Sequence, residues 1–164
     1  MTGPIETDRL VLEPLEPAHA TEMAAVLADP ALYGYTGGHA PSAEDLRRRY
    51  ELQAVGRSPD GAALWLNWIV RERRTGAAAG FVQATVEVAS HEADVAWIVG
   101  VAFQGRGYAC EAATAMVGRL REDGVTRVTA HIHPDNAPSE GVARALGLAP
   151  TTTVVDGELR WEAP

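Results

Sequence analysis

The fold is decided by the stretch from Asp94 to Glu111, which reads DVAWIVGVAFQGRGYACE. Its first half is apolar and rich in β-branched residues, which predicts a strand over Val95–Val101. The last residues of the stretch begin a predicted helix over Tyr108–Glu122. The apolar residues of this segment recur on one helical stripe, and an Asp-Gly pair ends it. Between them lies a loop with two glycines, Gln104–Gly107. A predicted strand and a predicted helix are therefore joined by a short glycine loop.

This glycine loop predicts an anion site. Successive backbone N–H groups in such a turn point at one spot, and the following helix adds its positive end, so that a pyrophosphate can be held without a lysine. Glycine is needed where a side chain would block the approach of the anion. Two other interpretations remain open, an ordinary strand-to-helix turn and a dinucleotide-binding GxGxxG motif. The second is disfavoured because Cys110 stands at the third glycine position and several strands precede the loop.

Outward from this stretch, hydrophobic periodicity and turn residues divide the chain into alternating elements. Strands are predicted over Leu10–Leu15, Trp65–Val70, Gly80–Val88, Arg127–Ile132, Thr152–Val155 and Leu159–Trp161. Helices are predicted over His19–Ala28, Ser42–Val55 and Pro138–Leu146, and a loop over Tyr33–Pro41. This order predicts an α/β fold with a mixed sheet.

Length and charge narrow the class of protein. The chain has 164 residues, 46% of them hydrophobic, and a formal net charge of -8. These values suit a single domain over residues 1–164. No apolar run approaches the roughly 20 residues of a membrane span, and the N-terminus lacks the layout of a secretory signal, which favours a cytoplasmic protein. The excess of acidic over basic residues argues against a nucleic-acid partner.

Rare and missing residue types exclude further chemistries. The chain contains no lysine, so all 14 basic residues are arginine. This excludes a GxxxxGKS/T phosphate loop, a kinase-type strand lysine and Schiff-base or pyridoxal chemistry. A single cysteine, Cys110, excludes an internal disulfide and a zinc site built on several thiolates. His131 and His133 alternate onto one strand face, but no third ligand is evident nearby, so no metal is expected.

Four segments together resemble one known family. The loop is similar to motif A of the GNAT N-acetyltransferases, Gln/Arg-x-x-Gly-x-Gly/Ala, with Gln104, Gly107 and Ala109 at the defining places. HPDNAPSEGVARALGL (133–148) is similar to the second conserved block of that family. The opening IETDRLVLEPL (5–15) and the ending around Asp156–Trp161 look like its RimJ/RimL branch. The resemblance implies a mostly antiparallel central sheet, helices on both faces, and a splayed pair of strands in mid-sheet.

The same resemblance implies a site for acetyl-CoA as cosubstrate. The pyrophosphate would contact the loop backbone, with Arg106 adding charge, and the pantetheine arm would lie in the splay. The residues so implied are Val99 and Val101 on the strand, Asn136 and Arg144 in the second block, and Gln104, Gly105, Arg106, Gly107, Tyr108 and Ala109 in and after the loop. Asn136 is equally typical of a helix cap. Arg144 would face either the nucleotide end of CoA or solvent, and solvent is favoured.

Acetyl transfer to an amine requires a base for the amine proton and an acid for the departing thiolate. Asp94, on the strand that leads into the loop, is the leading candidate for the base, directly or through water, with Glu87 and Glu92 as rivals. The resemblance places Ser139 near the thioester sulfur, which makes it the candidate acid. The tyrosine that many relatives use instead is missing from residues 148–153.

The acceptor is the least defined part of the prediction. It would be a primary amine, either of a protein N-terminus or of a small molecule, and the acidic surface favours a cationic one. Tyr33, Tyr35 and His39 are the candidates for the acceptor groove, because loops carry specificity. Direct transfer is preferred over a route through Cys110. A non-catalytic acyl-CoA-binding sensor or regulatory module is the alternative function, and a homodimer is left open.

Overall fold

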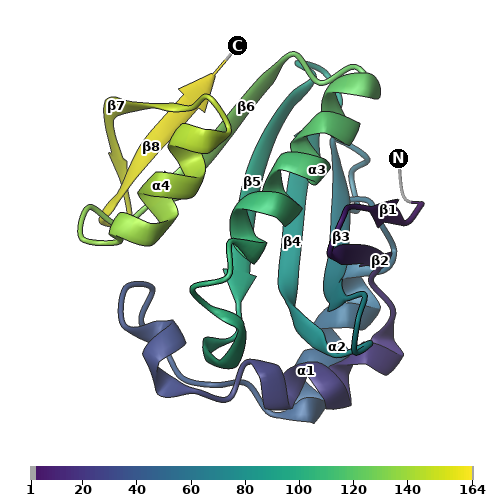
Figure 1. Ribbon diagram of the computed structural model, residues 1–164. Coiled ribbons are helices and arrows are strands. Elements are labelled where there is room, and N and C mark those ends of the chain that lie inside the picture. The colour runs from purple at the N-terminus through teal and green to yellow at the C-terminus, as the bar shows by residue number, and fades with distance from the viewer. Residues whose placement is uncertain (1–2, 164) are drawn as a thin grey trace.

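An eight-stranded sheet with helices on both faces forms the framework of the protein (Figure 1). The computed structural model describes residues 3–163. In that range the strand order is β1-β2-β3-β4-β5-β6-β8-β7. The strands are β1 (Ile5–Glu6), β2 (Leu10–Pro14), β3 (Ala63–Glu72), β4 (Ala78–Glu87), β5 (Glu92–Val99), β6 (Arg127–Ile132), β7 (Ala149–Val155) and β8 (Glu158–Ala163). The helices are α1 (Ala20–Val26), α2 (Ala43–Gln53), α3 (Tyr108–Glu122) and α4 (Ala137–Ala145), with 3-10 turns η1 (Pro17–His19), η2 (Pro30–Tyr33) and η3 (Val101–Phe103). The predicted α/β fold is confirmed.

One predicted boundary is wrong at the functionally important end of β5. The strand ends at Val99, and Val101 begins the 3-10 turn η3 instead of continuing the strand. At Gly100 the backbone packs closely on α1, since a Cβ atom there would lie 2.9 Å from Cγ1 of Val26. The chain turns there, and the N–H of Phe103 donates to the carbonyl of Gly100 at 2.9 Å. Val101 is therefore not available to pair with a ligand as part of a strand.

Two hydrophobic clusters cover the two faces of the sheet. Side chains alternate along β3, so Trp68 packs into the cluster under α3 and α4, whereas its neighbour Ile69 packs against α1 and α2. Met116 of α3 is fully buried in the first cluster, and Met23 of α1 is fully buried in the second. No helix within residues 3–163 is long and apolar enough to cross a lipid bilayer.

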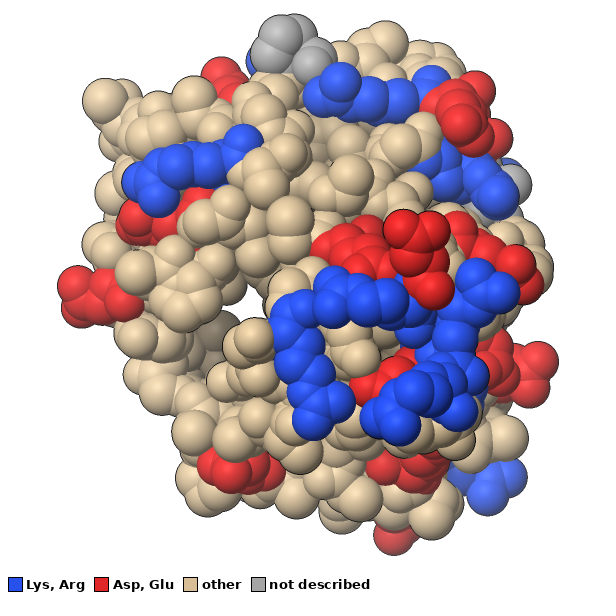
Figure 2. All heavy atoms as spheres, viewed as in Figure 1, with Lys and Arg blue, Asp and Glu red and all other residues tan. Residues whose placement is uncertain are grey.

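The sheet divides between β5 and β6, its only parallel pair in the described chain. Their register joins Glu92 to Arg127, Ala93 to Val128 and Asp94 to Thr129, and ends there. Beyond Asp94, β5 remains paired with β4, while β6 remains paired with β8, so the two halves of the sheet diverge (Figure 1). The splayed strand pair is thus confirmed. In the space-filling view a narrow opening at this place passes right through the molecule (Figure 2).

Candidate functional site

The glycine loop leaves backbone N–H groups free at the start of α3. Gly105 and Gly107 adopt left-handed conformations, with φ of 78° and 79°, which favour glycine. Gly107 is also the N-cap of α3. Within the described residues, the backbone N–H groups of Gly105, Arg106 and Gly107 have no hydrogen-bond partner, and all three residues are exposed. Combined with the positive end of a 15-residue helix, this is the geometry of an anion site.

Contacts from the N-terminal segment hold the loop in this shape. Glu111, in the first turn of α3, accepts hydrogen bonds from the hydroxyl of Thr7 at 2.7 Å and from the backbone N–H and Nε of Arg9 at 3.0 and 2.7 Å. The same guanidinium donates from Nη1 to the carbonyl of Arg106 at 2.7 Å and lies over the ring of Tyr108. The segment that leads into β2 is thereby tied to both sides of the loop.

Glu72, at the end of β3, is a buried carboxylate that also contacts the loop. It accepts hydrogen bonds from the hydroxyl of Tyr108 at 2.5 Å, the hydroxyl of Thr75 at 2.7 Å and Nη1 of Arg106 at 3.2 Å. The Tyr108 and Thr75 bonds hold the pKa of Glu72 below its usual range, although burial acts in the opposite direction. The guanidinium of Arg106, which the resemblance assigned to the pyrophosphate, is thus paired with a carboxylate while it remains half-exposed.

We expect Glu111→Gln to destabilise the protein by about 2 kcal/mol at pH 7, because it weakens charge-assisted hydrogen bonds. Burial raises the pKa of Glu111, but the hydrogen bonds from Thr7 and Arg9 outweigh it and leave the pKa below its ordinary value. Such a carboxylate stabilises the fold above its unfolded pKa, about 4.3, and loses that contribution as the pH falls through the lower folded pKa.

Urea denaturation at pH 7 and at pH 3.5 measures this effect. Wild type should lose more stability between the two pH values than Glu111→Gln does. The matched control is Glu51→Gln, which removes an exposed carboxylate 3.5 Å from Arg47 and should change the free energy of unfolding little. Equal losses in wild type and Glu111→Gln would contradict the assignment.

A cleft of about 450 Å³ lies at the splay, which is a size typical of small-molecule sites. It is lined by β5, β6, the start of α4, the loop after η2 and the turn between β7 and β8. Four of the residues that the sequence assigned to the site line this one cleft: Asp94, Asn136, Ser139 and Tyr35. The fold therefore brings together residues predicted separately as base, cosubstrate ligand, acid and acceptor contact.

The start of α4 forms one wall of the cleft. Oδ1 of Asn136 accepts a hydrogen bond from the N–H of Ser139 at 3.3 Å, so Asn136 caps the helix and lines the cleft at the same time. The indole Nε1 of Trp97 donates to Oγ of Ser139 at 3.3 Å. Because that oxygen accepts from Trp97, its own hydrogen is free to be donated into the cleft.

The opposite wall carries a group that the sequence analysis did not assign to catalysis. Oδ1 of Asp94 lies 3.0 Å from Nδ1 of His131 and accepts a hydrogen bond from the hydroxyl of Thr129 at 2.9 Å. The rivals of Asp94 do not line the cleft: Glu92 lies 3.6 Å from Nε of Arg127, and Glu87 is exposed at the end of β4. The alternation of His131 with His133 is the signal in the sequence, and such a pair indicates a metal site rather than a base.

The two histidines occupy separate environments. His133 accepts a hydrogen bond from the N–H of Asp135 at 3.1 Å, and its ring lies 5.3 Å from that of Tyr35. Within residues 3–163, no group of three or more His, Cys, Asp or Glu side chains is placed to hold a metal ion. The alternating pair therefore does not form a common site in the described chain.

Several predicted site residues lie outside the cleft. Tyr33 belongs to η2, donates its hydroxyl to the carbonyl of Leu27 at 2.7 Å and does not line the cleft. His39 is exposed and does not line the cleft. Arg144 lies over the ring of Trp161 and pairs with Glu140, at 62% side-chain exposure, in agreement with the solvent-facing interpretation.

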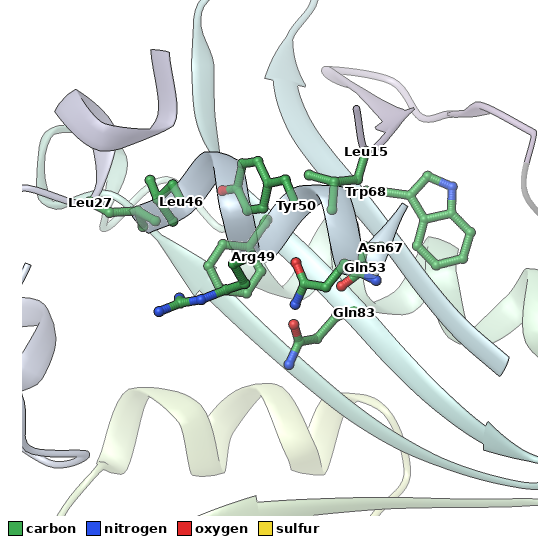
Figure 3. A pocket seen from close by; sticks show the side chains of 10 residues that line it. Leu15, Leu27, Leu46, Arg49, Tyr50, Gln53, Asn67, Trp68 and Gln83 are labelled. Atoms are coloured by element: carbon green, nitrogen blue, oxygen red, sulfur yellow. The ribbon is translucent and has the colours of Figure 1, made fainter. Parts of the chain in front are cut away.

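A second, smaller pocket lies between α2 and the face formed by β3 and β4. Figure 3 shows the amide groups of Gln53, Asn67 and Gln83 close together in it, beside Arg49. Its volume is about 40 Å³, which is room for only one or two water molecules. This pocket is therefore too small to hold a cosubstrate or a peptide.

Comparison with known proteins agrees with this architecture. No curated protein matches the sequence. Three solved structures illustrate the shared fold. A RimL ribosomal L7/L12 alpha-N-protein acetyltransferase in complex with coenzyme A has 15% sequence identity and a TM-score of 0.81, and the match covers 98% of this chain and 97% of that chain. An acetyl transferase from Salmonella typhimurium that modifies the N-terminal serine of 50S ribosomal subunit protein L7/L12 has 16% identity, a TM-score of 0.79 and 98% coverage of both chains, and a GNAT-family acetyltransferase from Bacillus anthracis has 18% identity, a TM-score of 0.78 and coverage of 98% of this chain and 97% of that chain.

The family model described as an acetyltransferase (GNAT) domain matches residues 9–149, which include the glycine loop, the splayed strands and α4. This match covers most of the chain and both halves of the site. The chain therefore belongs to the GNAT family of N-acetyltransferases.

Proposed function

We propose that the protein transfers an acetyl group from acetyl-CoA directly to a primary amine within a ternary complex. The observation that carries the proposal is the arrangement along β5. One end of this strand leads through η3 to the free N–H groups before α3, and the other end carries Asp94 into the cleft. A cosubstrate with its pyrophosphate at the loop could therefore extend along the strand and present its thioester in the cleft.

The edge of β5 offers a track for the pantetheine arm. Beyond Asp94, β5 has no partner in β6, so an extended arm that contains amides can pair with it as an added strand would. The carbonyl of Val99 already accepts a hydrogen bond from Nε2 of Gln104 at 3.0 Å. The arm would therefore use backbone groups that precede Val99, and Gln104 would hold the end of the strand.

For the acceptor we propose a protein N-terminus, as in the RimJ/RimL branch. Two of the structures that share the fold are named for modification of ribosomal protein L7/L12. The opening through the molecule would let an extended acceptor approach from the face opposite the cosubstrate (Figure 2). Asp156, in the turn between β7 and β8, and Glu158, the first residue of β8, line the cleft together with Asp94 and would attract an ammonium group.

The two walls of the cleft supply the proton transfers. The pair of Asp94 and His131 would accept the proton of the attacking amine, and Ser139 would donate its hydroxyl proton to the departing thiolate. Positioning of both substrates supplies much of the remaining barrier reduction.

A screen of amines and N-terminal peptides tests the proposal. Each is incubated with acetyl-CoA, and the release of the free thiol of CoA is measured. Transfer to at least one α-amine, with kinetics that require both substrates to be bound, is the expected result. Tight binding of acetyl-CoA without transfer to any amine would instead support the acyl-CoA-binding module.

Ser139→Ala should lower kcat about 100-fold, because general acid catalysis contributes about 10² to 10⁴ in rate. The dissociation constant of acetyl-CoA should change less than about threefold, since the cap uses the backbone N–H of Ser139 and not its hydroxyl. Ser139→Thr keeps the hydroxyl and should retain more activity than the alanine variant. Initial rates and calorimetry measure both quantities, and an unchanged kcat in Ser139→Ala would remove Ser139 from the mechanism.

A further inference from the structure

Of the histidines in residues 3–163, only His131 lines the cleft. It stands on β6 two residues beyond Thr129, the last position paired with β5. Its neighbours Ala130 and Ile132 are buried in the cluster under α3 and α4, so alternation along the strand places the imidazole on the opposite face. Asp94 reaches the same face from β5 for the same reason. The imidazole therefore lies at the point where the strands separate.

The carboxylate of Asp94 determines which ring nitrogen carries the proton. Nδ1 of His131 lies 3.0 Å from Oδ1 of Asp94, and an ionised carboxylate only accepts hydrogen bonds. The proton of the neutral ring is therefore on Nδ1, and the lone pair is on Nε2. No described residue forms a hydrogen bond with Nε2. The hydroxyl of Thr129, which is buried, holds the same carboxylate oxygen at 2.9 Å and keeps the pair in place.

We propose that Nε2 of His131 is the general base for the acceptor amine and that Asp94 is a positioning residue. This inference rests on the proposed function. The amine nitrogen attacks the thioester carbonyl carbon and forms the new C–N bond, while Nε2 takes one N–H proton. Collapse of the intermediate breaks the C–S bond, the electron pair leaves on sulfur, and the hydroxyl of Ser139 protonates it. The proton on His131 then returns to Ser139 through solvent, which restores both side chains.

Two observations favour His131 over Asp94 as the group that takes the proton. Oδ1 of Asp94 is engaged by the hydroxyl of Thr129 and by Nδ1 of His131, so this carboxylate holds the imidazole in place, and Nε2 of the ring has no partner among the described residues. Imidazoles are also the most frequent general bases in proteins, because they exchange protons readily near neutral pH. The carboxylates of Asp156 and Glu158 line the same cleft and would stabilise the imidazolium that forms.

Chemical rescue tests the proposal. We expect His131→Gly to lower kcat at least about 100-fold for the acceptor that wild type uses best. The dissociation constant of acetyl-CoA should stay within about threefold of wild type, since the ring does not contact the glycine loop. Added imidazole should raise the rate of this variant at least tenfold and leave wild type unchanged. His131→Gln, which keeps a polar side chain of similar size, should lose a similar factor without rescue, and thermal melting of both variants verifies the fold.

Two further variants separate catalysis from positioning. Asp94→Asn should lower kcat less than His131→Gly does, and the double variant should be no slower than His131→Gly alone, because both changes act on one unit. The matched control is His91→Asn, in the turn between β4 and β5, where φ is 58° and asparagine is tolerated. It should retain wild-type kinetics.

The outcomes distinguish this inference from the proposed function. If wild type transfers acetyl groups and the kcat of His131→Gln lies within threefold of the wild-type value, the role of His131 is overturned and the proposed function stands. A loss in folded His131→Gly that imidazole does not restore would also overturn it. Wild type that binds acetyl-CoA but acetylates no amine would overturn both.

Discussion

Gly80→Ala should destabilise the protein by about 3 kcal/mol or more, because the interior has no room for a single added methyl group there. Gly80 lies on β4 directly opposite Val99, the last residue of β5. A Cβ atom at this position would lie 2.0 Å from the carbonyl oxygen of Ile98 and 2.9 Å from Cα of Val99. Both are backbone atoms of the neighbouring strand, so no side-chain rotation can relieve the overlap. The two strands must separate where β5 approaches the glycine loop.

Urea denaturation measures this loss, and a matched glycine serves as the control. Gly118 lies within α3, and a Cβ atom there would meet nothing within 4 Å. Gly118→Ala should therefore stabilise the protein by up to about 1 kcal/mol through its higher helix propensity. Wild-type stability in Gly80→Ala would show that β4 and β5 are not as close as described.

Gly107→Val should reduce the affinity for acetyl-CoA about 100-fold or more. The φ of 79° at Gly107 is one that a β-branched residue adopts only with strain, so the loop must change shape to accept valine. The added side chain would also stand among the N–H groups that we assign to the pyrophosphate. The loss of two charge-assisted hydrogen bonds, at about 1.5 kcal/mol or more each, accounts for a factor of this size.

Gly124→Val is the control that separates the loss of acetyl-CoA binding at the loop from the strain of a β-branched residue at positive φ. Gly124 lies just beyond the other end of α3, with φ of 99° and nothing within 4 Å of a built Cβ atom. Its replacement should cost a similar amount of stability and leave acetyl-CoA affinity unchanged. Isothermal calorimetry with acetyl-CoA compares the two variants. Near-normal affinity in Gly107→Val would refute the assignment of the pyrophosphate to this loop.

Residues whose role depends on local geometry were the ones that the sequence could predict. The pair Gly105 and Gly107 and the start of α3 at Tyr108 follow from turn and helix signals within a few positions of one another. Asp94 and Ser139 were predicted through family resemblance, and the fold places both in one cleft.

Contacts across the sheet were not predictable in the same way. Nothing near His131 in the sequence indicates that Asp94, on another strand, would orient its ring. The same holds for the hydrogen bond between the hydroxyl of Tyr108 and Glu72, which joins α3 to the end of β3. Val101 was misplaced because the chain turns at Gly100, where its backbone packs closely on Val26 of α1, and strand periodicity contains no information about that packing.

By itself, the sequence determined the alternation of strands and helices and the glycine loop before α3, because φ preferences, periodicity and helix ends depend on neighbouring residues. Only the tertiary structure decided where β5 and β6 separate and which side chains meet at that point. Those positions depend on the pairing of β5 with β4 and of β6 with β8, and on packing between segments far apart in the chain. The pair of Asp94 and His131 exists because the last paired register of the two strands falls at Asp94 and Thr129.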